Sequence, residues 1–488
     1  MQHGMRRPGL RLVALGLSFG LLLAALPAPP SALAETTPPP GETTPTPTPT
    51  PTPVPAPPAD PIRVGLGRSQ ISAEVKAPAG LSVVADGAVQ LQTAAGQTLR
   101  LDLVQGQIQV AGVAKRFAGP VRLVPITPAP AAGATPPVPP PAPANPVSYA
   151  GRAYRGEIEV LVTKKDAKFS IVNVVNFEEY LLAVVPAEMP STWHPEALKA
   201  QAVASRTFAR YNMGKGKYPD EGFNVQNNTS DQEYDGLAGE KAAASQAVTA
   251  TAGQVLTYNG AVANTMYHSS SGGHTENNQI IYSGGTLVPY LQGVEDYDNV
   301  PGNRNYAWKY FYTPEEFKKK LIAGGYDVGD VVTVAAAGTP GSSGRPSQWR
   351  VIGMKLSALL TGERLRAVLS LPSSTRTVTT LPGGAVPAAR TYAGSQVVSV
   401  IGADSVVRQR TAAGTVVRGA AGPAAPAVGS LVTRGATIQL QGGFEVAGGG
   451  SGHAVGMSQW GAYGMALQGK TYVEILTHYY QGTKVETK

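Results

Sequence analysis

Short runs in which apolar and polar residues alternate dominate the first third of the chain. Alternation with a period of two is typical of strands with one buried face, and the runs follow one another at hairpin spacing. A Pro/Ala-rich tract at residues 127–146 interrupts them, and we interpret it as a loop inserted into a β-rich region. The expected strands lie within residues 62–67, 81–86, 99–104, 108–113 and 121–126 before the tract, and 154–165 and 168–176 after it.

The hydrophobic period changes to that of a helix between residues 178 and 223. Pro195 suits the first position of a helix, and Glu196 lies in the first turn, where the helix dipole favours an acid. The residues that share one face of this helix at 3.6-residue spacing are Ala200, Val203, Ala204, Thr207, Phe208 and Tyr211. The many alanines predict close packing against a neighbouring element.

A further helix is expected over about residues 237–252, stopping at Gly253. Asn259-Gly260, between two apolar runs, is the pattern of a two-residue hairpin turn. The loop SSSGGHTEN that follows is therefore expected at the end of a strand, where functional loops are often found.

Two later helices are indicated by capping boxes, in which a threonine is followed three residues later by a glutamate. These patterns lie at residues 313–316 and 471–474, and the helices are expected to end at Gly324 and Gly482. Residues 330–450 are rich in Gly, Ala and Val and predict further strands of unassigned topology. The fold class expected from these patterns is α+β, with β-rich N-terminal and C-terminal regions around a helical catalytic segment.

The N-terminus has the pattern of a secretory signal: arginines 6, 7 and 11, an apolar run over 12–26, and the small-residue site Ala32-Leu33-Ala34. An uncleaved anchor is the alternative interpretation. The expected organisation is a signal peptide at 1–34, a Thr/Pro-rich linker at 35–60, a β-rich region at 61–150, a catalytic core at 151–320, and a β-rich region with C-terminal helices at 321–488.

Composition fits an exported protein. The chain has no cysteine, which excludes disulfides and thiolate metal sites. Removing residues 1–34 takes away three arginines and no acid, so the formal charge falls from +8 to +5. This mild basicity suits work near anionic polymers. The sequence contains no basic run with interleaved aromatic residues, so it does not indicate nucleic acid as a partner.

Glu188 has unusual neighbours for a glutamate, because Val184, Val185, Pro186, Ala187, Met189 and Pro190 surround it. Apolar surroundings disfavour the ionised carboxylate, and an acid that stays protonated can donate to a glycosidic oxygen. An exposed loop glutamate is the alternative. A hydrolase with two carboxylates would need a second acid nearby; the candidates are Glu178, Glu179, Asp231 and Glu233. Since none shares the apolar setting, a single acid favours chemistry in which the sugar supplies its own nucleophile.

Three other groups of residues are candidates for binding or catalysis. Arg206 shares a helix face with Lys199 and Arg210, so it is either part of a solvated basic stripe or a cation that holds substrate. The loop from His268 to His274 suggests a serine hydrolase or a metal site, although each lacks further partners. The C-terminal segment GSGHAVGMSQWGAYG offers His453, Gln459 and Trp460, and its aromatic residues would either stack on sugars or pack in the core.

These segments together resemble the SpoIID/LytB family (stage II sporulation protein D and amidase enhancer). The matching pieces include YRGEIEV, VVNFEEYLLAVVPAEMPSTWHPEALKAQAVASRTFA, SDQEYDG, HSSSGGHTEN, PYLQGVED and GHAVGMSQWGAYGMALQGKTYVEILTHYY, in family order over about residues 62–485. The resemblance implies an exported peptidoglycan lytic transglycosylase. Such an enzyme cleaves the bond from N-acetylmuramic acid to N-acetylglucosamine and leaves a 1,6-anhydro end, without a required cofactor.

The resemblance also implies roles for particular residues. Glu188 would be the catalytic acid/base and Arg206 a second functional residue. The residues that would bind the glycan strand are His268, Ser269, Ser270, Ser271, Gly272, Gly273, His453, Gln459 and Trp460. Some members bind zinc near the serine-glycine loop; without cysteine, the possible ligands here are His268 and His274. Ala454 stands where the family tends to have glycine, which would shift that loop.

Two alternatives remain open. The protein could be a non-catalytic wall protein that binds murein and stimulates an amidase, or a hydrolytic muramidase. The expected partners are peptidoglycan strands and, in the first alternative, a cell-wall amidase; no stable membrane span is expected once residues 1–34 are removed.

Overall fold

The computed structural model describes residues 54–126, 140–282, 285–381 and 442–488, together with the backbone of four short strands at 385–387, 397–401, 407–411 and 437–439. The expected signal peptide, most of the 35–60 linker and most of the 127–146 insertion lie outside the described residues. Helices and several sheets occur together, which confirms the α+β class. Of the described helices, none combines the length and apolar character needed to cross a membrane.

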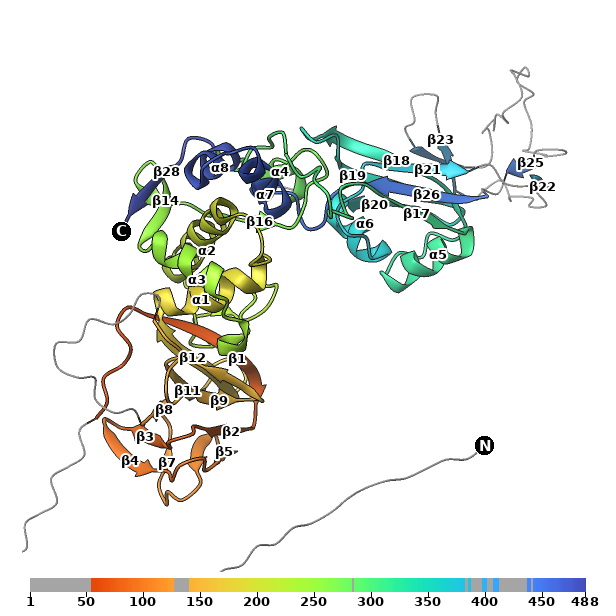
Figure 1. Ribbon diagram of the computed structural model, residues 1–488. Coiled ribbons are helices and arrows are strands. Elements are labelled where there is room, and N and C mark those ends of the chain that lie inside the picture. Colours follow the sequence, from red (N-terminus) through yellow and green to blue (C-terminus); the bar gives the residue numbers. More distant parts are fainter. Residues whose placement is uncertain are drawn as a thin grey trace, which may run out of the picture. The chain divides into compact units, whose positions relative to one another are not determined.

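Two sheets are built mainly from the alternating runs (Figure 1). In spatial order the first contains β13 (Val225–Gln226), β1 (Pro61–Gln70), β12 (Phe169–Asn176), β11 (Glu157–Val162), β8 (Val121–Pro125), β3 (Leu81–Ala85) and β4 (Ala88–Gln92). The second contains β10 (Arg152–Tyr154), β9 (Val147–Tyr149), β2 (Ser72–Lys76), β5 (Leu99–Val104), β6 (Gln107–Val110) and β7 (Arg116–Phe117). Because β8 pairs with β11, a boundary at residue 150 would divide one sheet.

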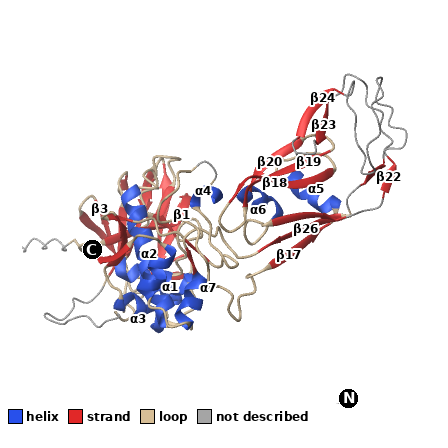
Figure 2. Cartoon of the chain, turned by 90° about the horizontal axis from the view of Figure 1, so that it is seen from above, coloured by secondary structure: helices blue, strands red, loops and turns tan. Residues whose placement is uncertain are grey.

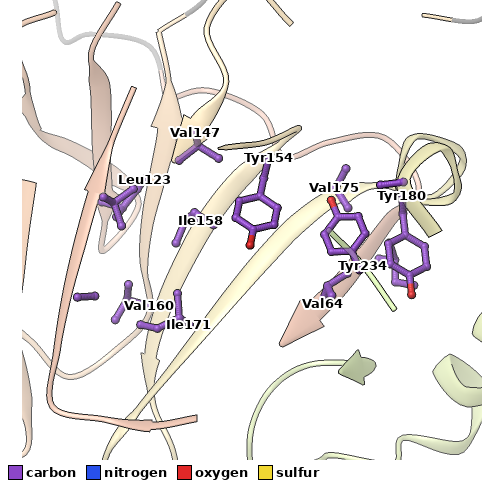
Figure 3. Packing of buried hydrophobic residues seen from close by; sticks show 14 of the residues in the cluster. Val64, Leu123, Val147, Tyr154, Ile158, Val160, Ile171, Val175, Tyr180 and Tyr234 are labelled. Atoms are coloured by element: carbon purple, nitrogen blue, oxygen red, sulfur yellow. The ribbon is translucent and has the colours of Figure 1, made fainter. Parts of the chain in front are cut away.

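Apolar side chains from both sheets form one core together with helix α1 (Phe177–Glu188). Figure 3 shows Tyr234 beside Tyr180, close to the sheet strands that carry Ile158 and Ile171. The ring centroids of Tyr234 and Tyr180 lie 5.0 Å apart, and those of Tyr234 and Tyr154 lie 5.8 Å apart. The Tyr234 hydroxyl also donates to Asn173 Oδ1 at 2.8 Å, which fixes the segment around residue 233 to the sheet and to α1.

The helices α1, α2 (Pro195–Lys215), α3 (Ala242–Ala250) and α7 (Gln459–Leu467) lie together (Figures 1 and 2), and α8 (Tyr472–Tyr479) also packs on α2. His194 caps α2 and Pro195 follows it, as the sequence predicts for the start of that helix. Ala200 and Ala204 are fully buried on the predicted face, and their short side chains let the neighbouring elements approach closely.

The hairpin predicted at Asn259-Gly260 joins β14 (Gln254–Tyr258) to β15 (Ala261–Val262), and both turn residues have positive φ angles, 50° and 79°. On its other side, β14 pairs with β28 (Lys484–Thr487). The loop SSSGGHTEN follows β16 (Tyr267–His268), which runs parallel to β27 (Met457–Ser458). The expected position of that loop at a strand end is therefore confirmed.

Two predicted helices differ from the structure. Residues 237–252 divide into the 3₁₀ turn η1 (Gly236–Gly239) and α3, because Glu240 between them is extended and its carboxylate is held by Arg155 at 2.6 and 2.9 Å. Helix α8 begins at the predicted capping box but ends at Tyr479, three residues before Gly482.

The β-rich prediction for residues 330–450 is confirmed where the structure describes them. One sheet orders β17 (Trp308–Tyr312), β26 (Gly443–Gly448) and β21 (Thr377–Leu381), and another orders β18 (Val331–Pro340), β19 (Pro346–Gly353) and β20 (Ser357–Thr361). Helices α5 (Pro314–Ala323) and α6 (Gly362–Leu369) share a core with them (Figure 1). The pairs β22 (Ala385–Pro387) with β25 (Thr437–Gln439) and β23 (Val397–Ile401) with β24 (Val407–Thr411) complete the described strands. Helix α5 has the predicted capping box at Thr313 and Glu316.

Candidate functional site

A pocket of about 520 Å³ lies where segments far apart in the sequence meet. It is lined by the end of α1, Phe208 of α2, the residues around 231 and strand β16. Tyr282 just after the short helix α4 (Asn278–Ile281), α6, and the segment leading into α7 complete the lining. Seven of the candidate residues named from the sequence line it: Glu188, Asp231, Glu233, His268, Ser269, His453 and Gln459. The structure therefore brings together residues that are up to 271 positions apart in the chain.

The sequence Glu188-Met189-Pro190 explains why the carboxyl group lies at this place. Pro190 disfavours the helical conformation of the preceding residue, and Met189 is extended with φ −137° and ψ 134°. Helix α1 therefore ends at Glu188. The Met189 side chain is buried in a second apolar core, with only 1% of its surface exposed, and anchors the chain just after the glutamate.

Glu188 is partly buried and carries a strongly perturbed pKa. Burial raises the pKa of its carboxyl group to about 6, which is the largest effect, and the nearby charge of Glu233 adds to it. Hydrogen bonds from the Glu233 backbone N–H (3.0 Å) and from the side chains of Tyr267 and Gln459 act in the opposite direction. The direction of this pKa shift agrees with the expectation from the apolar sequence neighbours, although the groups that contact the carboxyl group itself are polar.

A buried polar network orients the groups around Glu188. Tyr180 donates to Gln232 Oε1, and Gln232 Nε2 in turn donates to the Tyr267 hydroxyl, each at 3.1 Å. The hydroxyl proton of Tyr267 is therefore free to point at Glu188. Sequence reasoning missed Tyr267 and Gln232, although Gln232 lies inside the family-like segment SDQEYDG and Tyr267 directly precedes the segment that begins at His268.

If Glu188 acts as the acid in a reaction, two single substitutions should shift the alkaline limb of the pH–rate profile. The two shifts should have opposite directions. Tyr267→Phe removes a hydrogen bond that stabilises the carboxylate, so the pKa of Glu188 should rise and activity should persist to higher pH. Glu233→Gln removes a neighbouring negative charge, so the alkaline limb should move to lower pH. Rates measured over pH 4–9 would show the two shifts; profiles that superimpose on the wild type would exclude Glu188 as the titrating acid.

The two pocket histidines are neutral and fixed. His268 is 5% exposed and its Nδ1 lies 3.2 Å from the Val455 carbonyl oxygen, while Nε2 has no partner among the described residues. His453 Nδ1 accepts from the Val455 N–H at 3.1 Å, and burial lowers the pKa of this histidine to about 4. The free Nε2 of His268 can thus accept a hydrogen bond from a hydroxyl or amide of a ligand.

The loop around His453 requires an unusual backbone. Gly452 has φ 106°, and an added Cβ there would lie 2.8 Å from the Cβ of His268. Ala454 also has a positive φ, 65°, and is fully buried. Glycine adopts this left-handed conformation without strain, whereas alanine adopts it here at some cost.

Only the first part of the serine-glycine loop reaches the pocket. Ser269 lines it, whereas Ser270, Ser271, Gly272 and Gly273 are not among the described lining residues. They surround the buried carboxylate of Asp298, which accepts from the Ser270 hydroxyl at 2.6 Å and from the N–H groups of residues 271, 272 and 273 at 2.7–2.9 Å. The structure therefore gives these four residues a structural role, and the expectation that they bind the strand directly is not supported by their position.

Trp460 is half-buried and packs against two other half-buried aromatic side chains, Trp193 and Tyr463. Its ring centroid lies 4.5 Å from that of Trp193, whose ring stacks on Tyr463 at 4.7 Å. Trp460 is not among the described lining residues of the pocket, and its contact with the glycan strand stays a prediction.

Arg206 is not among the described residues that line the pocket, and it is 1% exposed. Its Nε and Nη2 donate to the two carboxylate oxygens of Glu178 at 2.7 Å each, and further bonds reach the Val248 and Gln254 carbonyl oxygens. It therefore ties α2 to the start of α1, to α3 and to β14. This buried ion pair with its hydrogen bonds differs from both interpretations made from the sequence, which were a solvated basic stripe and a cation that holds substrate.

The described residues do not form a recognisable metal site. Nowhere in the described ranges do three His, Cys, Asp or Glu side chains come close enough to hold a metal ion. His268 lies against His453, with ring centroids 5.4 Å apart, whereas His274 Nδ1 contacts the Thr275 carbonyl oxygen at 2.6 Å. The pair His268 and His274 thus does not fit zinc, which needs three or four protein ligands.

Comparison with known proteins shows the family to which the chain belongs. A family model described as "SpoIID: Stage II sporulation protein" matches residues 165–258, which include Glu188 and Arg206. An uncharacterized protein of Brachyspira hyodysenteriae is 30% identical over 321 residues, covering 64% of this chain and 68% of that protein. The chain belongs to the SpoIID family.

Two relatives of Bacillus subtilis have descriptive names. Stage II sporulation protein D is 28% identical over 337 residues, which is 66% of this chain and 77% of that protein. The amidase enhancer is 26% identical over 421 residues, which is 85% of this chain. The chain spans about half (52%) of the amidase enhancer's own length.

Proposed function

We propose that the protein is an extracytoplasmic lytic transglycosylase that cleaves peptidoglycan glycan strands with Glu188 as its single acid/base. The observation that carries the proposal is a carboxyl group in a pocket whose pKa is raised to about 6, beside neutral hydrogen-bonding side chains. The sporulation and amidase-enhancer names of its relatives support a role at the cell wall.

The reaction needs one acidic group that first donates a proton and later accepts one. Protonated Glu188 donates to the glycosidic oxygen as the bond from this oxygen to C1 of the muramoyl residue breaks, and an oxocarbenium-like centre forms at C1. The muramoyl C6 hydroxyl then attacks C1, and its proton passes to the Glu188 carboxylate. This step closes the 1,6-anhydro ring and restores the acid without consuming water.

The hydrogen bonds around Glu188 suit both halves of this cycle. Burial keeps the carboxyl group protonated before cleavage. After the proton has left, the Glu233 N–H and the Tyr267 and Gln459 side chains donate to the carboxylate and limit the cost of its charge in a partly desolvated place. They also fix its orientation toward the pocket.

Mass analysis of the products tests the proposal. Purified protein incubated with glycan strands should release muropeptides or disaccharides that end in 1,6-anhydromuramic acid, each lighter by one water than a hydrolytic product. Reducing muramic ends would exclude the lytic reaction, and intact strands after prolonged incubation would exclude an enzyme that acts on glycan strands.

A hydrolytic muramidase is the second candidate, because Glu233 lines the same pocket as Glu188 and its carboxylate has no hydrogen-bond or ion-pair partner in the described part of the chain. It could activate a water molecule. Digestion in heavy-oxygen water separates the two reactions: hydrolysis places the label at C1 of the new end, whereas the lytic reaction incorporates none. A non-catalytic amidase enhancer, the third candidate, would bind strands and cleave none.

A further inference from the structure

The pocket of Glu188 contains one strong cation, and it comes from a part of the chain to which neither the sequence nor the family comparison assigns a role. Arg366 lies on α6, more than one hundred residues beyond the segment that the family model matches. Of the described residues that line the pocket, it is the sole arginine or lysine. Because both pocket histidines are neutral, Arg366 is the positively charged group among these lining residues, and its charge is shared with an ion pair to Glu363.

The guanidinium group of Arg366 is held in place by hydrogen bonds, but one of its nitrogens has no partner among the described residues. Nη1 donates to Glu363 Oε2 at 2.9 Å, and Nε lies 3.4 Å from the Leu371 carbonyl oxygen. Nη2 has no hydrogen-bond partner among the described residues, and about a quarter (26%) of the Arg366 side chain is exposed. Two contacts thus fix the plane of the group while one nitrogen stays available to a ligand.

The charge of Arg366 acts on its neighbours in the pocket. Together with burial it lowers the pKa of His453, and it counteracts the effect of burial on Tyr282. The rings of Tyr282 and His453 are tilted by 48° with their centroids 6.2 Å apart, and Tyr282 is 42% exposed. An arginine beside a partly exposed aromatic ring suits a sugar that carries an acidic group, because the ring can stack on the sugar face while the arginine pairs with the acid.

An uncharged glycan would not need this cation. The other charged groups that line the pocket, Glu188, Asp231 and Glu233, are acids, and the charge of Asp231 is met by Lys217 at 2.6 Å. An anionic ligand would be repelled by Glu233 unless a positive group lay at its binding position. Arg366 supplies that group.

We propose that Arg366 binds a carboxylate of the bound glycan strand and so selects strands by their charge. This inference rests on the proposed function, since it takes the glycan strand as the ligand. Peptidoglycan offers such a carboxylate from two sources: the lactyl group of a muramoyl residue that carries no stem peptide, or the free acids of a stem peptide.

The test measures binding rather than cleavage, in a Glu188→Gln background that leaves the strands intact. Fluorescence anisotropy would give the affinity for three labelled probes: peptide-free strands, the same strands with carboxylates converted to amides, and stem-bearing strands. The parent protein should prefer a charged probe over the amidated one by roughly tenfold, the effect of one charge-assisted hydrogen bond at a partly exposed site. Preference for the peptide-free or for the stem-bearing probe identifies which source supplies the acid.

Arg366→Gln should abolish that preference, and Arg366→Lys should retain part of it. Arg364→Gln is the matched control, because Arg364 lies on the same helix but donates to the Tyr326 hydroxyl and the Gly324 carbonyl oxygen. A preference for charged strands that survives in a folded Arg366→Gln protein, or an equal loss of affinity for charged and amidated strands, would overturn the inference. Charge-selective binding that depends on Arg366 in a protein that cleaves nothing would uphold it and refute the proposed function alone.

Discussion

Replacing Glu188 by glutamine is expected to lower the rate of strand cleavage by a factor of about 10² to 10⁴, the usual contribution of a general acid. Glutamine keeps the shape of the side chain and can still accept from the Glu233 N–H, but it has no proton to give or retrieve. Release of anhydro-ended products, followed by mass spectrometry, is the measurement. Glu179→Gln is a matched control on the same helix: its carboxyl group also has a pKa raised by burial, but it lines a different pocket.

The same substitution should leave the protein at least as stable as before. The pKa of Glu188 is about 6 in the folded protein against an ordinary value of 4.5, so its carboxyl group favours folding below pH 4.5 and loses that effect as pH rises through 6. Glutamine does not ionise, and at pH 8 the free energy of unfolding should rise by up to about 2 kcal/mol. Cleavage that persists in a stable Glu188→Gln protein would contradict the assignment of Glu188 as the acid.

Arg206→Ala should act through stability, with an expected loss of about 3 kcal/mol in the free energy of unfolding. The substitution removes both bonds to the carboxylate of Glu178 and leaves carbonyl groups of α3 and β14 without their donor. A loss near the lower end of the range for buried ion pairs is expected, because Glu178 is still 35% exposed. Urea denaturation followed by circular dichroism would measure it.

Arg152→Ala provides the comparison for Arg206. Arg152 and Asp235 are also separated by 2.7 Å, but about half of each side chain is exposed, so the loss should be at most about 1 kcal/mol. An Arg206→Ala protein that is as stable as the wild type and yet inactive would contradict this prediction. Arg206 would then act on the substrate and not through stability. Cleavage that returns at low temperature, where the variant is folded, would support the structural role.

Local sequence signals predicted the parts of the fold that local physics decides. Positive φ angles favour Asn259-Gly260 in a hairpin turn, and a threonine followed by a glutamate closes the first turn of α5 and α8. These effects act within four residues, so the sequence shows them directly. Where a distant partner intervened, as Arg155 does at Glu240, the predicted helix divided into two elements.

The candidate site was predictable in its central residue and less so in its surroundings. The apolar neighbours of Glu188 pointed to a raised pKa, and Pro190 ends the helix at this residue. The hydrogen bonds that orient the carboxyl group come from Glu233, Tyr267 and Gln459, between 45 and 271 positions further along the chain. No periodicity in one segment indicates which side chains of another segment will face it.

By itself the sequence determined the strand and helix types, the family, and an acidic residue in a setting that resists ionisation. Tertiary structure alone decided which charges meet: it buried Arg206 against Glu178, enclosed Asp298 in the serine-glycine loop, and placed Arg366 in the pocket of Glu188. The reason is that backbone preferences depend on neighbours in the chain, whereas the energy of a charge depends on the groups and the solvent around it in space.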